Sequence, residues 1–209
     1  MEDQYKGERV LVFKRSLLEE LGNFQGIERD IERYLNAILD KRNNHFHLRS
    51  EAEKDEGLKQ IIPYILFVNE NGEVFSYVRG KQAGETRLIG NRSVGIGGHI
   101  NPVDESLFSS PSVSSDMQTY LEAVRREIDE EVIVRAPYDP VITALINDDS
   151  NPVGRVHFGI VHICRVSHDG VEKREKQITQ AGFLPASELS GPRRAELETW
   201  SALAIDLLE

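Results

Sequence analysis

Residues 126–131 read Arg-Glu-Ile-Asp-Glu-Glu, and this acidic stretch is the most informative part of the 209-residue chain. On a helix that advances about 100° per residue, Glu127, Glu130 and Glu131 share one sector of about 100°. Like charges three and four residues apart repel each other by a few tenths of a kcal/mol per pair. Divalent cations bound through oxygen ligands would reverse that repulsion. Taken alone, however, such a cluster is more typical of a solvated acidic helix face.

A glycine-rich segment adds to the argument. Residues 95–102 read Gly-Ile-Gly-Gly-His-Ile-Asn-Pro and follow a predicted strand, and Asp104 lies just beyond them. Adjacent glycines allow the backbone to approach a ligand or a metal closely. Two other glycine-loop interpretations fail, because a dinucleotide fingerprint would need glycine where Ile100 stands and a P-loop would need a Gly-Lys-Ser/Thr end.

Together these two segments resemble the signature of the Nudix hydrolases, which is Gly, five residues, Glu, seven residues, then Arg-Glu-apolar-x-Glu-Glu-x-Gly-apolar. Gly98 takes the first place, residues 126–131 match the central run, and Val134 takes the last apolar place. There are three departures. Asp104 replaces the expected Glu, Ile133 replaces the last Gly, and 21 residues separate Asp104 from Arg126 instead of seven, so 14 are inserted.

The resemblance implies an α/β/α sandwich around a mixed sheet and a hydrolase that cleaves a nucleoside diphosphate linked to another group. It implies Mg²⁺ or Mn²⁺ as the cofactor, held by Glu127, Glu130, Glu131 and the backbone carbonyl of Gly97. Arg126 would hold a carboxylate by a bidentate pair, for which guanidinium geometry is suited. Glu127 is the candidate general base, although the family varies in which residue takes that role.

Two alternatives to hydrolysis differ in how well the sequence supports them. A non-catalytic nucleotide-binding or regulatory domain could keep the fold, although degenerate members usually lose one Glu of the Glu-Glu pair and this chain keeps both. An isomerase of the isopentenyl diphosphate type would need a cysteine near the glycine-loop strand. The single cysteine, Cys164, lies on a late predicted strand instead.

Substrate contacts are harder to predict. The candidates are Gly98 and His99 of the glycine loop, with Arg79 and Arg87 among the basic residues that precede it. Lys81 and Arg92 belong to the same basic group, and surface pairing is the alternative for all four. Residues 148–152 (Asp-Asp-Ser-Asn-Pro) are most simply a turn, since Asp and Asn bond their own backbone there. His157 and His162 lie five apart on a predicted strand, so they face opposite sides and cannot share one metal site.

The chain is predicted to be of the α+β class, with a mixed sheet and packed helices. Residues 1–60 are predicted as a helical extension and residues 61–209 as a Nudix-like catalytic domain. Within the latter we expect strands at 61–68, 74–78, 86–89, 93–96, 141–146, 156–166 and 182–184, a helix that starts after Ser115, and a final helix from near Pro192. The 14-residue insertion coincides with a Ser-rich loop.

The amino-acid composition narrows the possible binding partners and the cellular location of the protein. The chain carries 25 Lys and Arg against 35 Asp and Glu, a formal net charge of −10. Such an acidic protein repels phosphate over most of its surface, so general nucleic-acid binding is not expected. One cysteine, no signal-like segment and no apolar run of membrane-spanning length indicate a cytoplasmic protein without a membrane partner. Apolar helices at both ends make a homodimer plausible.

Overall fold

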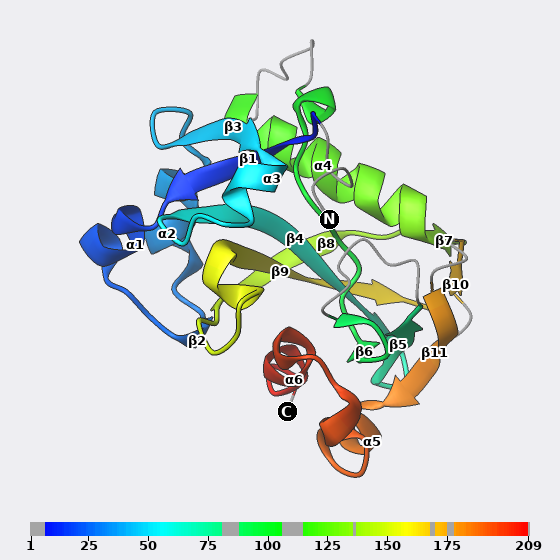
Figure 1. The fold of residues 1–209 in the computed structure, drawn as a ribbon. Helices are drawn as coiled ribbons and strands as arrows, with labels where there is room; N and C mark the ends of the chain where they lie inside the picture. Colours follow the sequence, from blue (N-terminus) through cyan, green and yellow to red (C-terminus); the bar gives the residue numbers. More distant parts are fainter. Residues whose placement is uncertain are drawn as a thin grey trace. The chain divides into compact units, whose positions relative to one another are not determined.

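The computed structural model describes residues 7–80, 88–105, 115–135, 137–167, 170–174 and 178–208 (Figure 1). The chain divides into two compact units. The first unit comprises Met1–Pro63, Gly98–Arg126 and Ala144–Ile160, and the second comprises Tyr64–Gly97, Glu127–Thr143 and Val161–Glu209. Four long elements contribute residues to both units: β4 (Leu58–Asn69), β8 (Pro140–Asn147), β9 (His157–Val166) and α4 (Ser115–Glu131).

The first unit combines short helices with strands. Its further elements are β1 (Arg9–Lys14), α1 (Ser16–Leu21), β2 (Gly26–Glu28), α2 (Ile31–Leu39), β3 (Asn44–Leu48), α3 (Arg49–Ala52) and the 3₁₀ turns Pro102–Asp104 and Gly154–Val156. Strand order here is β3-β1-β4-β9-β8-β2. β1 pairs antiparallel with both β3 and β4, and β2 pairs antiparallel with β8.

The prediction that residues 1–60 are helical is therefore wrong in part. Helices do form at α1 and α2, but β1, β2 and β3 are strands that belong to the sheet. β1 is short and buried on both faces, so it shows no period-two alternation. Ile27, for example, falls within the predicted helical extension, yet it lies on β2, paired with Ile146. The domain boundary at residue 60 stays a prediction.

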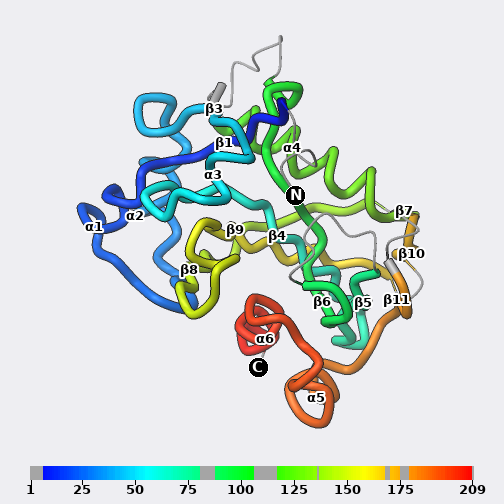
Figure 2. Tube along the Cα trace, viewed as in Figure 1, coloured from blue at the N-terminus to red at the C-terminus, as the bar shows by residue number. Residues whose placement is uncertain are grey.

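The second unit contains strands of the sheet followed by C-terminal helices. Its further elements are β5 (Glu73–Arg79), β6 (Arg92–Ser93), β7 (Val132–Val134), β10 (Val171–Lys173), β11 (Ile178–Pro185), α5 (Ala186–Ser190), a 3₁₀ turn at Arg194–Glu196 and α6 (Thr199–Ile205). Strand order is β11-β5-β4-β9-β8, with β6 beside β5, and β7 pairs with β10 separately. The tube in Figure 2 shows the chain passing from β11 into α5 and α6.

Most predicted elements of 61–209 are present, with two corrections. Leu88 and Ile89, the described part of the expected strand at 86–89, form a turn, and the final helix begins at Thr199 because 3₁₀ and irregular backbone occupies residues 191–198. The predicted α+β class is confirmed. Among the described residues, no helix has the length and apolar character that a membrane crossing would need.

Candidate active site

Helix α4 carries the acidic cluster. It begins at Ser115 as predicted and ends at Glu131. Tyr120, Val124 and Ile128 are buried, which fixes the rotation of the helix about its axis. Glu127 lies beside this apolar stripe and is only 7% exposed, whereas Glu130 is exposed and Glu131 is half-buried. The cluster therefore differs from a uniformly solvated acidic face.

The helix ends without the glycine that the family signature expects. β7 follows directly at Val132, so Ile133 stands in a strand paired with Glu172 of β10. The amide of Arg174 donates to the carbonyl of Glu131 at 2.8 Å. A strand, rather than a flexible turn, terminates α4, and this explains why the chain does without glycine at residue 133.

Gly97 lies in the same unit as the three carboxylates. The preceding residue, Ile96, exchanges two backbone hydrogen bonds with Ile65 of β4, at 2.8 and 2.9 Å. Gly97 itself has φ of 153°, a region that side chains disfavour. The strand bridge thus fixes the backbone at the point where the sequence predicts a carbonyl ligand.

Arg79 was predicted to bind substrate, and its guanidinium makes a bidentate ion pair with Glu198. Nε and Nη2 donate to the two carboxylate oxygens at 2.9 and 3.2 Å, and the Glu198 side chain is 4% exposed. Burial alone would lower the pKa of Arg79, but the charges of Glu198 and, to a smaller degree, Glu131 outweigh it and hold that pKa above its usual range. Arg79 is thus held mainly by Glu198, while its role toward substrate stays a prediction.

In the first unit, Arg126 makes the bidentate contact that guanidinium geometry favours, and its carboxylate is Asp104. Nε donates to Oδ1 at 2.7 Å and Nη2 donates to Oδ2 at 3.0 Å. Nη2 also donates to the carbonyl of His99 at 2.8 Å, and the amide of Asn101 donates to Asp104 Oδ2 at 2.7 Å. The Asp in place of Glu therefore reaches Arg126, and together they fix the glycine loop.

We expect Arg126→Lys to lower the free energy of unfolding by about 1.5–3 kcal/mol, because an ammonium cannot replace both parallel hydrogen bonds to the buried Asp104. Urea denaturation measures the loss. Arg125→Lys is the matched control, since Arg125 is exposed and pairs with Glu122 on the helix surface. Equal, small losses in the two variants would contradict the anchoring role of Arg126.

The side chain of His99 faces His157, which the sequence did not predict. The two Nε2 atoms lie 3.2 Å apart, and Nε2 of His157 lies 3.7 Å from Oε1 of Glu53. Burial lowers the pKa of His99 well below its usual range, and the nearby charge of Arg49 adds to the decrease. His157 and Glu53 are 58 and 46 residues from His99, so no local spacing could reveal this cluster.

Other candidates have more ordinary surroundings. Burial lowers the pKa of His162 to about 4, and its Nδ1 lies 3.1 Å from the Pro140 carbonyl, so this is the packed histidine of the predicted pair. Arg92 is buried against Ser76 and Glu196. Arg87 and Lys81 lie outside the described residues. Gly98 is half-buried, and a substrate role for it stays a prediction.

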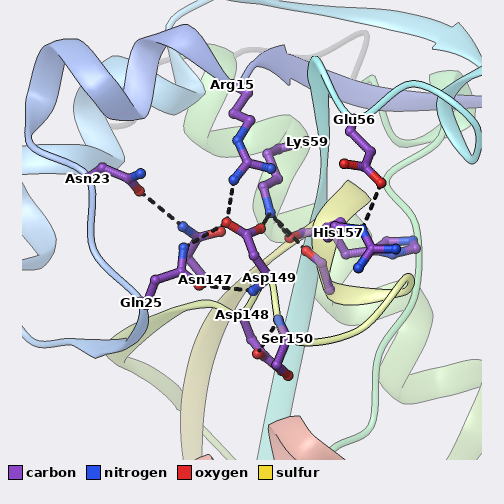
Figure 3. A network of polar contacts seen from close by, with 12 residues as sticks. Arg15, Asn23, Gln25, Glu56, Lys59, Asn147, Asp148, Asp149, Ser150 and His157 are labelled. Atoms are coloured by element: carbon purple, nitrogen blue, oxygen red, sulfur yellow. Dashed lines mark hydrogen bonds and ion pairs between the residues drawn. The ribbon is translucent and has the colours of Figure 1, made fainter.

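Residues 148–152 form the expected turn, where Asp148 accepts a hydrogen bond from the amide of Ser150. Asp149 has a further role (Figure 3). Its carboxylate accepts hydrogen bonds from Arg15, from Gln25 at 2.7 Å and from the ammonium of Lys59 at 2.8 Å. The Lys59 side chain is fully buried. An ionic network thus holds this turn.

The chain was compared with known proteins. No protein-family model matches it. It is 30% identical to Tm1382, a protein assigned to the Nudix hydrolases, with a TM-score of 0.75 over 96% of this chain and 98% of that one. The chain belongs to the Nudix hydrolase family. It is accordingly a Nudix-type phosphoanhydride hydrolase.

Two further comparisons extend this result. Protein YmaB of Bacillus subtilis (strain 168) is 33% identical over 203 residues, which are 95% of this chain and 93% of that protein. The NUDIX domain of Shewanella oneidensis NrtR, solved with ADP ribose, is 12% identical with a TM-score of 0.50 over 71% of this chain and 84% of that one. At that identity the likeness concerns the Nudix fold alone. The similarities to Tm1382 and to YmaB, in contrast, extend over almost the whole chain, so they include most of residues 1–60.

Proposed function

We propose that the chain hydrolyses the phosphoanhydride bond of a nucleoside diphosphate linked to a second group, with Mg²⁺ or Mn²⁺ as the cofactor. The observation that carries this proposal is the acidic end of α4. Glu127, Glu130 and Glu131 lie at helix positions i, i+3 and i+4, with buried, exposed and half-buried environments in turn. Gly97 belongs to the same unit.

The donor set fits the proposed ion. Three carboxylates and a backbone carbonyl offer oxygen atoms alone, which is the ligand chemistry of Mg²⁺ and Mn²⁺. A bound ion would neutralise charge on the phosphoryl oxygens and lower the pKa of a bound water. Glu127 is proposed to accept the proton of the attacking water, and Glu130 and Glu131 to hold the ion.

The other site residues have supporting roles in this proposal. Arg126 positions the glycine loop through Asp104 and the His99 carbonyl. Arg79 and Arg87 are proposed to contact substrate phosphates, as are Gly98 and His99 of the loop. For Arg79 this requires that Glu198 share or release the guanidinium, since the two form a bidentate pair in the structure.

The direct experiment incubates the protein with Mg²⁺ and a panel of nucleoside diphosphate sugars, ADP ribose, dinucleoside polyphosphates and nucleoside triphosphates. We expect phosphate-containing products from at least one compound, and none after the divalent ion is chelated. Turnover that persists without a divalent ion would contradict the proposal. A compound that raises the melting temperature without turnover would favour the alternative, a non-catalytic nucleotide-binding domain.

Two further expectations stay proposals. A reducing, cytoplasmic location is supported by the single cysteine, Cys164, which is buried so that the pKa of its thiol rises to about 12. Such a thiol is unreactive near neutral pH. A homodimer is the second expectation, and sedimentation of the purified protein tests it.

A further inference from the structure

The cluster of Glu53, His99 and His157 in the first unit is separate in chemistry from the carboxylates of α4. One ligand atom from each residue lies within 4.8 Å of the others. The three side chains come from different places: Glu53 directly follows α3, His99 belongs to the glycine loop, and His157 is the first residue of β9. The function proposed above uses neither Glu53 nor His157.

We propose that Glu53, His99 and His157 form a binding site for a divalent transition-metal ion of the Zn²⁺ class. Two imidazoles and one carboxylate are a ligand set that holds zinc in known hydrolases, with a fourth position left for water. Imidazole selects Zn²⁺, Co²⁺ or Ni²⁺ over Mg²⁺, which prefers oxygen donors.

The spacing of the ligand atoms agrees with such an ion. Ligands about 2.0–2.1 Å from a tetrahedral ion lie roughly 3.3–3.4 Å from one another. The two Nε2 atoms are 3.2 Å apart, and His157 Nε2 is 3.7 Å from Glu53 Oε1. The third pair, His99 and Glu53, lies within the 4.8 Å that spans all three ligand atoms, so the carboxylate would have to move toward His99 to complete the geometry.

The surroundings of the ligands support the assignment. His157 Nδ1 lies 2.8 Å from the carbonyl oxygen of Val153, which can only accept a hydrogen bond. Nδ1 therefore carries the proton, and Nε2 of the neutral ring presents its lone pair toward His99. Metal-binding histidines are commonly held by such a bond from the other ring nitrogen.

Arg49 lies near the same carboxylate oxygen of Glu53 that faces His157. Arg49 Nε lies 3.6 Å from Glu53 Oε1, and Arg49 Nη1 also bonds Glu8, at 3.0 and 3.2 Å. The side chains of Glu53 and His157 are 12% and 6% exposed, so little solvent competes for them. Because Arg49 also pairs with Glu8, it does not neutralise the Glu53 carboxylate alone.

The test is metal titration of the purified, metal-stripped protein. Calorimetry with Zn²⁺ in millimolar Mg²⁺ is expected to show one site per chain, and Co²⁺ to give visible absorption bands of tetrahedral type. His157→Gln and Glu53→Gln are expected to weaken Zn²⁺ binding at least tenfold. His47→Gln is the matched control, because His47 and Glu51 form a 3.0 Å pair outside the three-ligand cluster.

A measurement on the unaltered protein tests the proposal even if the variants fail to fold. Long-range ¹H–¹⁵N spectra of the histidine rings are expected to show Nε2 of two histidines shifting when Zn²⁺ is added, together with a rise in melting temperature. Unchanged ring signals, or Zn²⁺ binding that is equal in His157→Gln, His47→Gln and the unaltered protein, would overturn the assignment. Hydrolysis is not the readout, so failure here leaves the Mg²⁺-dependent reaction untouched.

Discussion

Asp149→Asn is expected to lower the free energy of unfolding by about 3 kcal/mol, a large part of the 5–15 kcal/mol typical of a protein. The substitution leaves the fully buried Lys59 ammonium without its carboxylate. The carbonyl oxygens of Gly154 and His157 remain within 2.8 and 3.3 Å, but dipoles compensate a buried charge less well. Urea denaturation at neutral pH measures the change.

The matched control is Glu56→Gln, which breaks the partly exposed ion pair between Arg155 and Glu56. The side chains of Arg155 and Glu56 are 35% and 59% exposed, so the expected loss of unfolding free energy is below about 1 kcal/mol. Equal losses in the two variants would show that the Asp149 network contributes no more than a surface pair.

The pH dependence of the free energy of unfolding provides a second, independent test of the Lys59–Asp149 pair. Burial lowers the pKa of Lys59 relative to the unfolded chain. Deprotonation of Lys59 therefore removes the cost of a buried charge in the folded state. The loss of unfolding free energy in Asp149→Asn is expected to become smaller as pH rises from that lowered pKa toward 10.5, the ordinary pKa of lysine. Asp149 itself has a lowered pKa, because the hydrogen bonds from Lys59, Gln25 and Arg15 outweigh the effect of burial. Its own contribution is lost only when acid protonates it below 3.8.

The second large effect concerns activity. Glu131→Gln is expected to lower kcat with Mg²⁺ by about 10²–10³-fold on any compound that the substrate panel identifies, because a neutral amide is a weaker ligand and leaves phosphoryl charge uncompensated. The substitution keeps the size of the side chain, so little change in melting temperature is expected. Steady-state kinetics over a range of Mg²⁺ concentrations measures the effect.

Glu122→Gln is the control for helix charge. Glu122 lies on the same helix and pairs with Arg125 at the surface, so its substitution removes a negative charge without touching the proposed ligands. We expect activity within a factor of two of the unaltered enzyme. Full activity in Glu131→Gln would contradict the assignment of the acidic cluster as the metal site.

The sequence predicted the parts of the fold that depend on local patterns. The helix expected after Ser115, the strand expected at 61–68 and the strand expected at 74–78 follow from such patterns, and all three are present as α4, β4 and β5. β1, β2 and β3 were missed because each is short, and β1 is in addition buried on both faces. Their pairing with distant strands, rather than local propensity, determines their structure.

The candidate site, too, was predictable only where it depends on local sequence. Glu127, Glu130 and Glu131 could be grouped from helix geometry, and Arg126 was expected to hold a carboxylate. That the Glu-to-Asp departure still supplies this carboxylate could not be read from the signature, because it depends on the 3₁₀ turn that carries Asp104. The contacts of His157 with His99 and Glu53 depend on tertiary structure over more than 40 residues of separation, which no spacing rule covers.

The direct passage of α4 into β7 has a mechanical consequence. The last turn of a helix ordinarily frays, and a carboxylate there would swing with it. Here the β7–β10 ladder and the bond from Arg174 clamp that turn, so the turn cannot unravel unless the ladder opens as well. Substitutions in residues 171–174 would therefore change the mobility of the acidic end of α4, although none of these residues belongs to the proposed ligand set.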